Sequence, residues 1–550
     1  MSALRGVSSI GLILGLLFFT ASLTPSLIPR GAAVQGALGG LVMALGYLAW
    51  WLVSLLFRAA EFPEFRGVAL RWMVGLAGAC AVALFGTTLW QTLEWQNELR
   101  AKMGIPIVEG EHLATICAIG LLVFLVCWAA GATFLGFFHL VQKRLYLLMP
   151  ERRANVSALV IVVAILFVVS RDGIYDIVVT RLDESYEAAQ DLFETAPPPP
   201  EDPNKTGGKN SLVAWDALGA PGRNFVLDGP RQQAIEAFAG RPALDPIRVY
   251  VGRANGETPE ERAELALAEL KRQGAFERSV LVVASPTGTG WLDPGSHDPL
   301  EYMHGGDIAT VAAQYSYLQS PLALILETDA GLEQARALLE TVHEYWKTLP
   351  RDRRPRLYAH GLSLGAWSSM YGTNLFRLVN DPINGALWAG PPFSSSFWNY
   401  VQNERNEGSP WVLPTVGDGS LVRYASHYAD ASEATSEWGD MRIVFLQYSS
   451  DPIVFYDPAS LWRAPPWMND PPAPDASERM SFIPIVTQFQ LAVDMALAFG
   501  APGGHGHAYF AQDYSVPWVE VSAPENWSDA DTARLKAHCD NGFQNGCNNE

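Results

Sequence analysis

Residues 356–372 read RLYAHGLSLGAWSSMYG, and this stretch decides the fold of the C-terminal part of the chain. The run RLYA is typical of a short buried strand, and AWSSMYG can continue as a helix. Between them lies GLSLG (residues 361–365). A G-x-S-x-G turn between a strand and a helix holds its serine in a tight elbow at the helix N-terminus, which makes Ser363 a candidate nucleophile. The alternative interpretation is a glycine-rich helix start with a buried serine.

Outward from this turn, short apolar runs alternate with helical patterns. We expect strands at residues 247–251, 279–284, 322–326, 356–360, 386–389 and 442–448. We expect helices at residues 258–272, 308–317, 331–346 and 483–499. Short apolar strands separated by helices predict a mostly parallel sheet that is covered on both faces.

A serine nucleophile needs a base, and the base needs an orienting carboxylate. Enzymes with this elbow carry the acid and then the histidine after the serine in the chain. Asp451 follows the strand expected at 442–448, where a carboxylate projects from the end of a sheet. It could instead be a turn-forming residue before Pro452, and Asp457 is the reserve.

Two histidines can supply the base. His505 and His507 lie in the loop GGHGHAY (residues 503–509), whose glycines give a catalytic histidine room to move. We predict a triad of Ser363, Asp451 and His507, with His505 as the alternative base.

An oxyanion hole needs two N–H donors that face the developing charge. The first expected donor is the amide of Leu364, directly after the nucleophile. The second is expected from the loop PTGTGW (residues 286–291), at Thr287 or Gly288. No lysine follows that loop as a phosphate-binding Walker motif requires, so we do not expect it to bind phosphate.

The composition indicates a membrane protein. Hydrophobic residues make up 49% of the 550 residues and charged residues only 17%. Residues 1–180 carry 12 basic and 9 acidic residues, whereas the remaining 370 carry 26 and 48. The acidic net charge of −19 argues against a nucleic-acid partner. A near-neutral apolar first third is what a lipid bilayer selects.

Five apolar runs in the first third predict about five transmembrane helices, because a span needs about 20 residues. They lie between residues 5 and 30, 30 and 58, 71 and 94, 113 and 142, and 154 and 170. The first run could instead be a cleaved signal peptide. The fifth is rich in β-branched residues and could be a buried strand.

Basic residues suggest an orientation. Those at 5, at 58–71 and at 143–153 share one side if all five runs cross, and the positive-inside rule makes that side cytoplasmic. The C-terminal part would then lie outside the cytoplasm of a bacterial inner membrane. There Cys539 and Cys547 could form a disulfide. We expect a transmembrane domain at 1–180, a Pro- and Gly-rich linker at 181–245, and a catalytic domain at 246–550.

Several stretches together resemble the bacterial membrane-anchored alpha/beta-hydrolase family 9, including its N-terminal membrane domain. They are SLTPSLIPR (22–30), GAFERSVLVVASPTGTGWLDP (274–294), EYMHGGDIATVAAQYSYL (301–318), HGLSLGAWSS (360–369) and GHGHAY (504–509). The resemblance implies a C-terminal α/β-hydrolase domain with a serine-hydrolase-like site outside the cytoplasm. The family pattern G-H-x-Y favours His507 as the base. Leu362 stands where many members carry Glu, which could alter what the pocket admits.

We therefore expect a membrane serine hydrolase that acts on an ester or related acyl substrate, which could be lipid-derived. An acyltransferase would use the same nucleophile, and a non-catalytic membrane-anchored binding domain is the third hypothesis. The sequence predicts no cofactor and no metal site. The expected partners are the lipid bilayer and a small-molecule or lipid acyl substrate.

Overall fold

The computed structural model describes residues 8–62, 67–168, 197–318, 323, 327–373, 380–431, 434, 436–540 and 546–547, and it divides the chain into two units. The first unit consists of Met1–Arg181 together with Asp457–Asp494. The second consists of Leu182–Tyr456 together with Met495–Glu550. The segment Asp457–Asp494 thus belongs to the helical unit, whereas the sequence analysis placed all of 246–550 in one catalytic domain.

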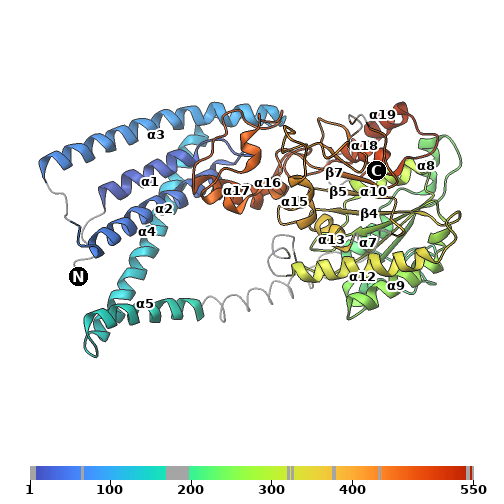
Figure 1. Cartoon of the computed structure of the whole chain (residues 1–550), viewed down its shortest axis with the longest axis horizontal. Coiled ribbons are helices and arrows are strands. Elements are labelled where there is room, and N and C mark those ends of the chain that lie inside the picture. The colour runs from blue at the N-terminus through green and yellow to red at the C-terminus, as the bar shows by residue number, and fades with distance from the viewer. Residues whose placement is uncertain are drawn as a thin grey trace. The chain divides into compact units, whose positions relative to one another are not determined.

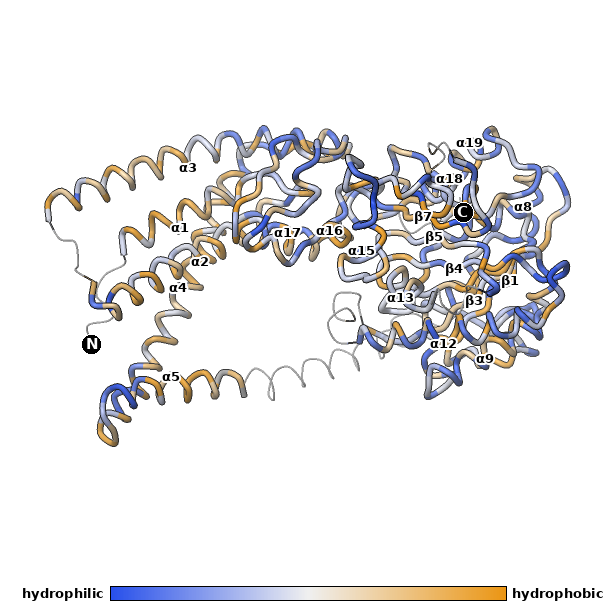
Figure 2. The backbone as a smooth tube through the Cα atoms, viewed as in Figure 1, coloured by the Kyte–Doolittle hydropathy of each residue, from blue (hydrophilic) through white to orange (hydrophobic). Residues whose placement is uncertain are grey.

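Five long helices precede the second unit in the described part of the chain (Figure 1). They are α1 (Ser9–Ser22), α2 (Ala32–Ala59), α3 (Val68–Lys102), α4 (Glu111–Leu145) and α5 (Glu151–Val168). The segment Asp457–Asp494 adds η6 (Pro458–Leu461), η7 (Pro466–Asn469) and most of α17 (Val486–Leu497). Figure 2 shows α1, α2 and the first part of α3 as predominantly hydrophobic.

Three of these helices, α2, α3 and α4, are long and apolar enough to cross a membrane. The five helices lie on the five predicted apolar runs, and membrane crossing by α1 and α5 stays a prediction. Helix α1 has 14 residues, or about 21 Å at 1.5 Å per residue, because the chain leaves the helix after Ser22 in a segment with two prolines. Helix α5 begins with three charged residues, ERR. It is nevertheless a helix, so the alternative of a buried strand is wrong.

A buried ion pair holds the loop between α1 and α2. Arg30 Nε lies 2.7 Å from Asp494 Oδ1, and both side chains are at most 1% exposed. The Leu27 amide donates to Asp494 Oδ2 over 3.1 Å, and the Ser26 hydroxyl donates to the same oxygen. The Arg30 guanidinium also donates to Gln35 Oε1 over 3.1 Å. The motif SLTPSLIPR therefore forms a polar loop that fixes α17 to the N-terminal helices.

The second unit contains a parallel sheet of seven strands in the order β1-β3-β2-β4-β5-β7-β6. The strands are β1 (Ile247–Val251), β2 (Val280–Ser285), β3 (Ile308–Ala313), β4 (Arg356–Leu362), β5 (Gly385–Ala389), β6 (Val422–Ala425) and β7 (Arg442–Leu446). In the register of the sheet, Leu362 faces Ala389 and Ala389 faces Leu446. The carboxyl ends of β4, β5 and β7 therefore meet at one edge, as a parallel sheet requires.

The structure corrects one part of the predicted strand order. Residues 308–313, expected in a helix, form β3 between β1 and β2. The segment IATVAA is at most 1% exposed throughout, so burial on both faces and its β-branched residues outweigh the helix propensity of alanine. The strand expected at 322–326 falls largely outside the described residues, and Ala323, which is described, is helical.

Helices cover both faces of the sheet, with α9 and α12 adjacent on one face and α10 and α18 adjacent on the other (Figure 1). The capping box of Thr258 and Glu261 starts α9, as its spacing predicted. The α-helices of this unit are α7 (Gly219–Leu227), α8 (Gln232–Ala239), α9 (Pro259–Arg272), α10 (Pro294–Met303), α12 (Thr328–Lys347), α13 (Leu364–Gly372), α15 (Ser396–Asn403), α16 (Pro452–Phe455), α18 (Ala511–Ser522) and α19 (Asp529–His538). Short 3-10 turns lie at η2 (Trp215–Ala217), η3 (Arg253–Asn255), η4 (Ala275–Glu277) and η8 (Ala498–Gly500).

The described part of the expected linker, residues 197–245, is folded onto the sheet. Trp215 and Phe225 are buried, and α7 packs against β1. The Thr206 hydroxyl donates to the carbonyl of Arg248 in β1 over 2.9 Å. The apolar residues that follow the proline-rich stretch therefore make this segment part of the domain and not a free spacer.

Candidate active site

Ser363 lies on the turn between β4 and α13. Its backbone adopts φ 58° and ψ −126°, a left-handed conformation that costs energy for a residue with a Cβ and that recurs at functional sites. The amide of Ser363 donates to the carbonyl of Ala389 in β5 over 2.9 Å, which holds the turn against the neighbouring strand. The side chain is 2% exposed.

The two glycines of the motif are required by close packing. A Cβ on Gly365 would lie 2.1 Å from the carbonyl oxygen of Ser285 at the end of β2. A Cβ on Gly361 would lie 2.3 Å from the backbone of Gly365. Any larger residue would push α13 away from the sheet, so GLSLG is the sequence that lets the helix start this close to the strands.

Asp451 and His507 form a hydrogen-bonded pair that is fully buried. His507 Nδ1 lies 2.6 Å from Asp451 Oδ2, and both side chains are 0% exposed. Asp451 follows β7 and caps α16, where its Oδ1 accepts the Ile453 amide over 2.8 Å. The carboxylate is thus held by the helix start on one oxygen and orients the imidazole with the other.

Tyr509 also donates to Asp451, and the sequence analysis gave this residue no role. Its hydroxyl lies 2.8 Å from Asp451 Oδ2, and its ring stacks on Tyr448 with centroids 4.2 Å apart. Burial and the negative charge of Asp451 raise the pKa of Tyr509, so the hydroxyl keeps its proton and remains a donor. The signal for this residue in the sequence was its position two residues after His507.

The imidazole of His507 lies at the strand end next to Ser363. Gly390 follows β5, as Ser363 follows β4, and the preceding residues Leu362 and Ala389 face each other. Gly390 has φ 51°, and a Cβ there would lie 2.7 Å from His507 Cε1. His507 Nε2 is buried and has no hydrogen-bond partner among the described residues. It therefore makes no hydrogen bond to Ser363 in this structure.

The alternative acid and base lie elsewhere. The His505 ring lies beside the His427 ring, with centroids 5.1 Å apart. Asp457 caps η6, where it accepts the Ala459 amide over 2.8 Å, and it belongs to the first unit. Of the candidates that the sequence left open, the structure joins Asp451 to His507.

The predicted oxyanion donors differ in whether their backbone amides already donate a hydrogen bond within the protein. Leu364 is the first residue of α13, so its N–H has no acceptor within the helix. The Thr287 amide, in contrast, donates to the carbonyl of Trp291 over 3.0 Å, and the Thr287 hydroxyl contacts the same oxygen. This corrects the expectation for Thr287, whose amide closes its own turn. Gly288 is buried in that turn and stays a candidate.

Models of known protein families match both parts of the chain. A model of the alpha/beta-hydrolase family matches residues 247–535, and a model of the alpha/beta-hydrolase family N-terminus matches residues 23–230. Curated proteins and solved structures give no match. The first match alone covers more than half of the chain, and it includes the elbow, Asp451 and His507. The chain therefore belongs to alpha/beta-hydrolase family 9, in its N-terminal region as well as in its hydrolase domain.

Proposed function

We propose that this membrane protein is a serine hydrolase of the esterase or lipase type, with Ser363 as nucleophile, His507 as general base and Asp451 as the residue that orients the base. The observation that carries the proposal is the buried hydrogen bond between Asp451 and His507, whose imidazole lies at the strand end next to a strained serine elbow. A serine elbow after β4, an aspartate after β7 and a histidine bonded to that aspartate suit acyl transfer.

The chemistry follows from these positions. Ser363 Oγ bonds to the carbonyl carbon of the ester while His507 Nε2 takes the hydroxyl proton. The carbon–oxygen bond to the alcohol breaks, and His507 returns the proton to the leaving alkoxide. Water then attacks the acyl-serine, His507 accepts a proton from that water, and Ser363 regains its hydrogen as the carboxylic acid leaves. The amides of Leu364 and Gly288 are the proposed donors to the oxyanion.

A fluorophosphonate probe tests the nucleophile on the full chain in membranes. We expect the wild type to be labelled and Ser363→Ala to be unlabelled. Ser279→Ala is the matched control. Ser279 precedes β2 at the amino end of the strand, whereas Ser363 follows the carboxyl end of β4, and the Ser279 hydroxyl donates to the backbone carbonyl of Asp307. Labelling that survives Ser363→Ala would assign the nucleophile elsewhere. Adding water or alcohols to the acyl-enzyme then separates a hydrolase from an acyltransferase.

We further propose that the hydrolase domain lies outside the cytoplasm of a bacterial inner membrane. Two observations support this location of the hydrolase domain. Basic residues cluster at the end of α4 and the start of α5, at Lys143, Arg144, Arg152 and Arg153, and such clusters mark the cytoplasmic side. With α5 as a crossing helix, the hydrolase domain follows on the opposite side. Cys539 and Cys547 form a disulfide, which persists in oxidising compartments. A C-terminal alkaline phosphatase fusion should be active, and an inactive fusion together with an active fusion after residue 62 would reverse the orientation.

A further inference from the structure

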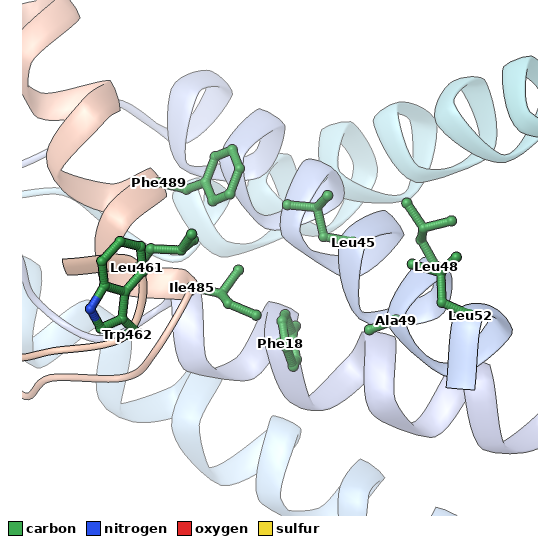
Figure 3. A pocket seen from close by; sticks show the side chains of 9 residues that line it. All are labelled: Phe18, Leu45, Leu48, Ala49, Leu52, Leu461, Trp462, Ile485 and Phe489. Atoms are coloured by element: carbon green, nitrogen blue, oxygen red, sulfur yellow. The ribbon is translucent and has the colours of Figure 1, made fainter. Parts of the chain in front are cut away.

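The first unit contains a pocket that the hydrolase site does not use. Its volume is about 480 Å³, within the roughly 300–1,000 Å³ that ligand pockets occupy. Helices α1 and α2 supply one side, and the segment Asp457–Asp494 supplies the other, as Figure 3 shows. It is lined by Phe18, Leu45, Leu48, Ala49, Leu52, Leu461, Trp462, Ile485 and Phe489.

Every side chain that lines this pocket is apolar, apart from the indole N–H of Trp462. Three of the lining residues of α2, Leu45, Leu48 and Leu52, lie within a helix long and apolar enough to span a membrane. Water has no partners in such a recess, so hydrocarbon is the material that fills it. Trp462 is 68% exposed, and exposed tryptophan is typical of the membrane–water interface. The pocket therefore fits a chain whose body lies in the bilayer.

The backbone at Ile485 is strained where it enters this pocket. Ile485 has φ 69°, a conformation that is unfavourable for a β-branched residue. Its amide donates to the carbonyl of Leu461 over 2.9 Å, so the strained turn joins two segments of the lining. Glycine would adopt this conformation freely, yet the position carries a large apolar side chain that faces the pocket (Figure 3). Strain of this kind accumulates where a side chain has a binding role.

The lining segment is also the connection between the two partners of the buried pair. Along the chain, Asp457–Asp494 follows Asp451 by six residues and ends 13 residues before His507. The ion pair of Arg30 with Asp494 fixes the far end of this segment within the first unit. A ligand in the pocket would thus contact the piece of chain that links the acid to the base.

We propose that this pocket binds one hydrocarbon chain of a membrane lipid, and that long-chain acyl esters of lipids are the substrate class of the hydrolase. The second statement rests on the proposed function, whereas the first does not. No other occupant matches a wholly apolar recess on a membrane-spanning helix as well as a lipid chain does.

Photo-crosslinking tests the pocket on the full chain in phosphatidylethanolamine and phosphatidylglycerol vesicles. The probe is a phosphatidylglycerol that carries a diazirine on a palmitoyl chain. We expect crosslinks to map to residues 45–52 and 485–489, and Ala49→Trp, which fills the pocket, to reduce them about tenfold. Leu121→Trp is the control, because Leu121 is an exposed residue of α4 outside the pocket. Equal crosslinking of these residues in the wild type and in Ala49→Trp would contradict the proposal that the pocket binds a lipid chain.

Ile485→Gly gives a second variant in case the bulky substitution prevents folding. Glycine relieves the positive φ, so this variant should fold at least as readily while its crosslinks fall. Fluorophosphonate labelling of Ser363 reports folding in each variant without a lipid. Ile485→Gly with normal labelling and undiminished crosslinks would contradict the binding role of this side chain.

Ester turnover tests the substrate class. For p-nitrophenyl esters, we expect kcat/KM to rise by up to about fourfold per added methylene. Equal kcat/KM for the acetate and the long-chain esters would overturn the proposed substrate class. A wild type that crosslinks lipid but is not labelled by the fluorophosphonate would end the proposed function and leave the pocket in place.

Discussion

Asp451 Oδ2 accepts two hydrogen bonds, one from His507 Nδ1 over 2.6 Å and one from the Tyr509 hydroxyl over 2.8 Å. Its other oxygen accepts the Ile453 amide over 2.8 Å. All three side chains are fully buried, so no water competes for these bonds. The carboxylate is therefore fixed in position before a substrate arrives, and it fixes the imidazole in turn.

Asp451→Asn should lower kcat by about 10³- to 10⁴-fold, because an amide can donate to Nδ1 and so select the wrong tautomer of His507. Ester hydrolysis and the rate of fluorophosphonate labelling measure the loss. Asp457→Asn is the matched control, since Asp457 also precedes a proline and caps a short helix. Equal activity of the two variants would remove Asp451 from the proposed site.

Tyr509→Phe removes one of the two bonds to Asp451 Oδ2 and keeps the ring stacked on Tyr448. We expect a loss of about 1 kcal/mol in the free energy of unfolding and a roughly tenfold lower kcat with KM unchanged. Tyr514→Phe is the control, because Tyr514 is an equally buried tyrosine of α18 whose hydroxyl makes no hydrogen bond to Asp451. A change in KM alone would assign Tyr509 to substrate binding.

Gly390→Ala should displace His507 without unfolding the domain. The added Cβ would lie 2.7 Å from His507 Cε1, so the imidazole must shift from its position. The positive φ costs about 1–2 kcal/mol in either case, and Gly240→Ala isolates that cost because Gly240 has φ 65° and open space around it. We expect both variants to lose similar stability and only Gly390→Ala to lose labelling of Ser363.

The elbow and the predicted acid could be read from the sequence because each follows a short apolar strand, whereas the predicted base was read from the glycine-rich loop that holds it. Asp451 and Asp457 could not be separated in this way, since both precede a proline and both cap a helix. What separates them is tertiary: Asp451 remains at the end of β7, whereas Asp457 begins the segment that packs with the N-terminal helices. That packing depends on Asp494 meeting Ser26 and Arg30, which are more than 460 residues away along the chain.

The sheet was predictable where strands are uniformly apolar and less so where they are rich in alanine. VLVVAS reads as a strand and forms β2, whereas IATVAA has the spacing of a helix and becomes β3 only because it is enclosed by β1 and β2. The edge strand β6 was missed because VRYA carries an arginine in four residues. Its guanidinium pairs with Glu520 over 2.9 Å, a contact that local sequence does not reveal.

Glu301→Gln tests a buried charge cluster beneath the sheet. Glu301 and Asp298 share the guanidinium of Arg248 at 2.7 Å each, and burial raises the pKa of Glu301 from 4.5 to about 7. The folded state then binds more protons than the unfolded state between those values, so this group lowers stability as pH rises from about 4.5 to about 7. We expect the melting temperature of the wild type to fall more steeply than that of Glu301→Gln across this window. Parallel curves would show that Glu301 ionises alike in both states.

Asp494→Asn should destabilise the first unit, because it leaves the Arg30 guanidinium buried without its counter-charge. Removing one partner of such a pair costs about 3–5 kcal/mol, whereas Asp457→Asn in the same segment should cost well under 1 kcal/mol, since asparagine caps helices as well as aspartate. Thermal unfolding in detergent and proteolysis within 457–494 measure the two effects.

The double variant Arg30→Met with Asp494→Leu separates charge from packing at this position. Replacing both ions with apolar groups of similar size removes the desolvation cost together with the attraction, so we expect it to recover part of the stability that Asp494→Asn loses. Such a recovery would show that the penalty in the single variant comes from an unpaired buried charge. A double variant as unstable as the single one would instead assign the loss to the hydrogen bonds that Asp494 accepts from Ser26 and Leu27, and the loop SLTPSLIPR would then owe its shape to those bonds and not to the ion pair.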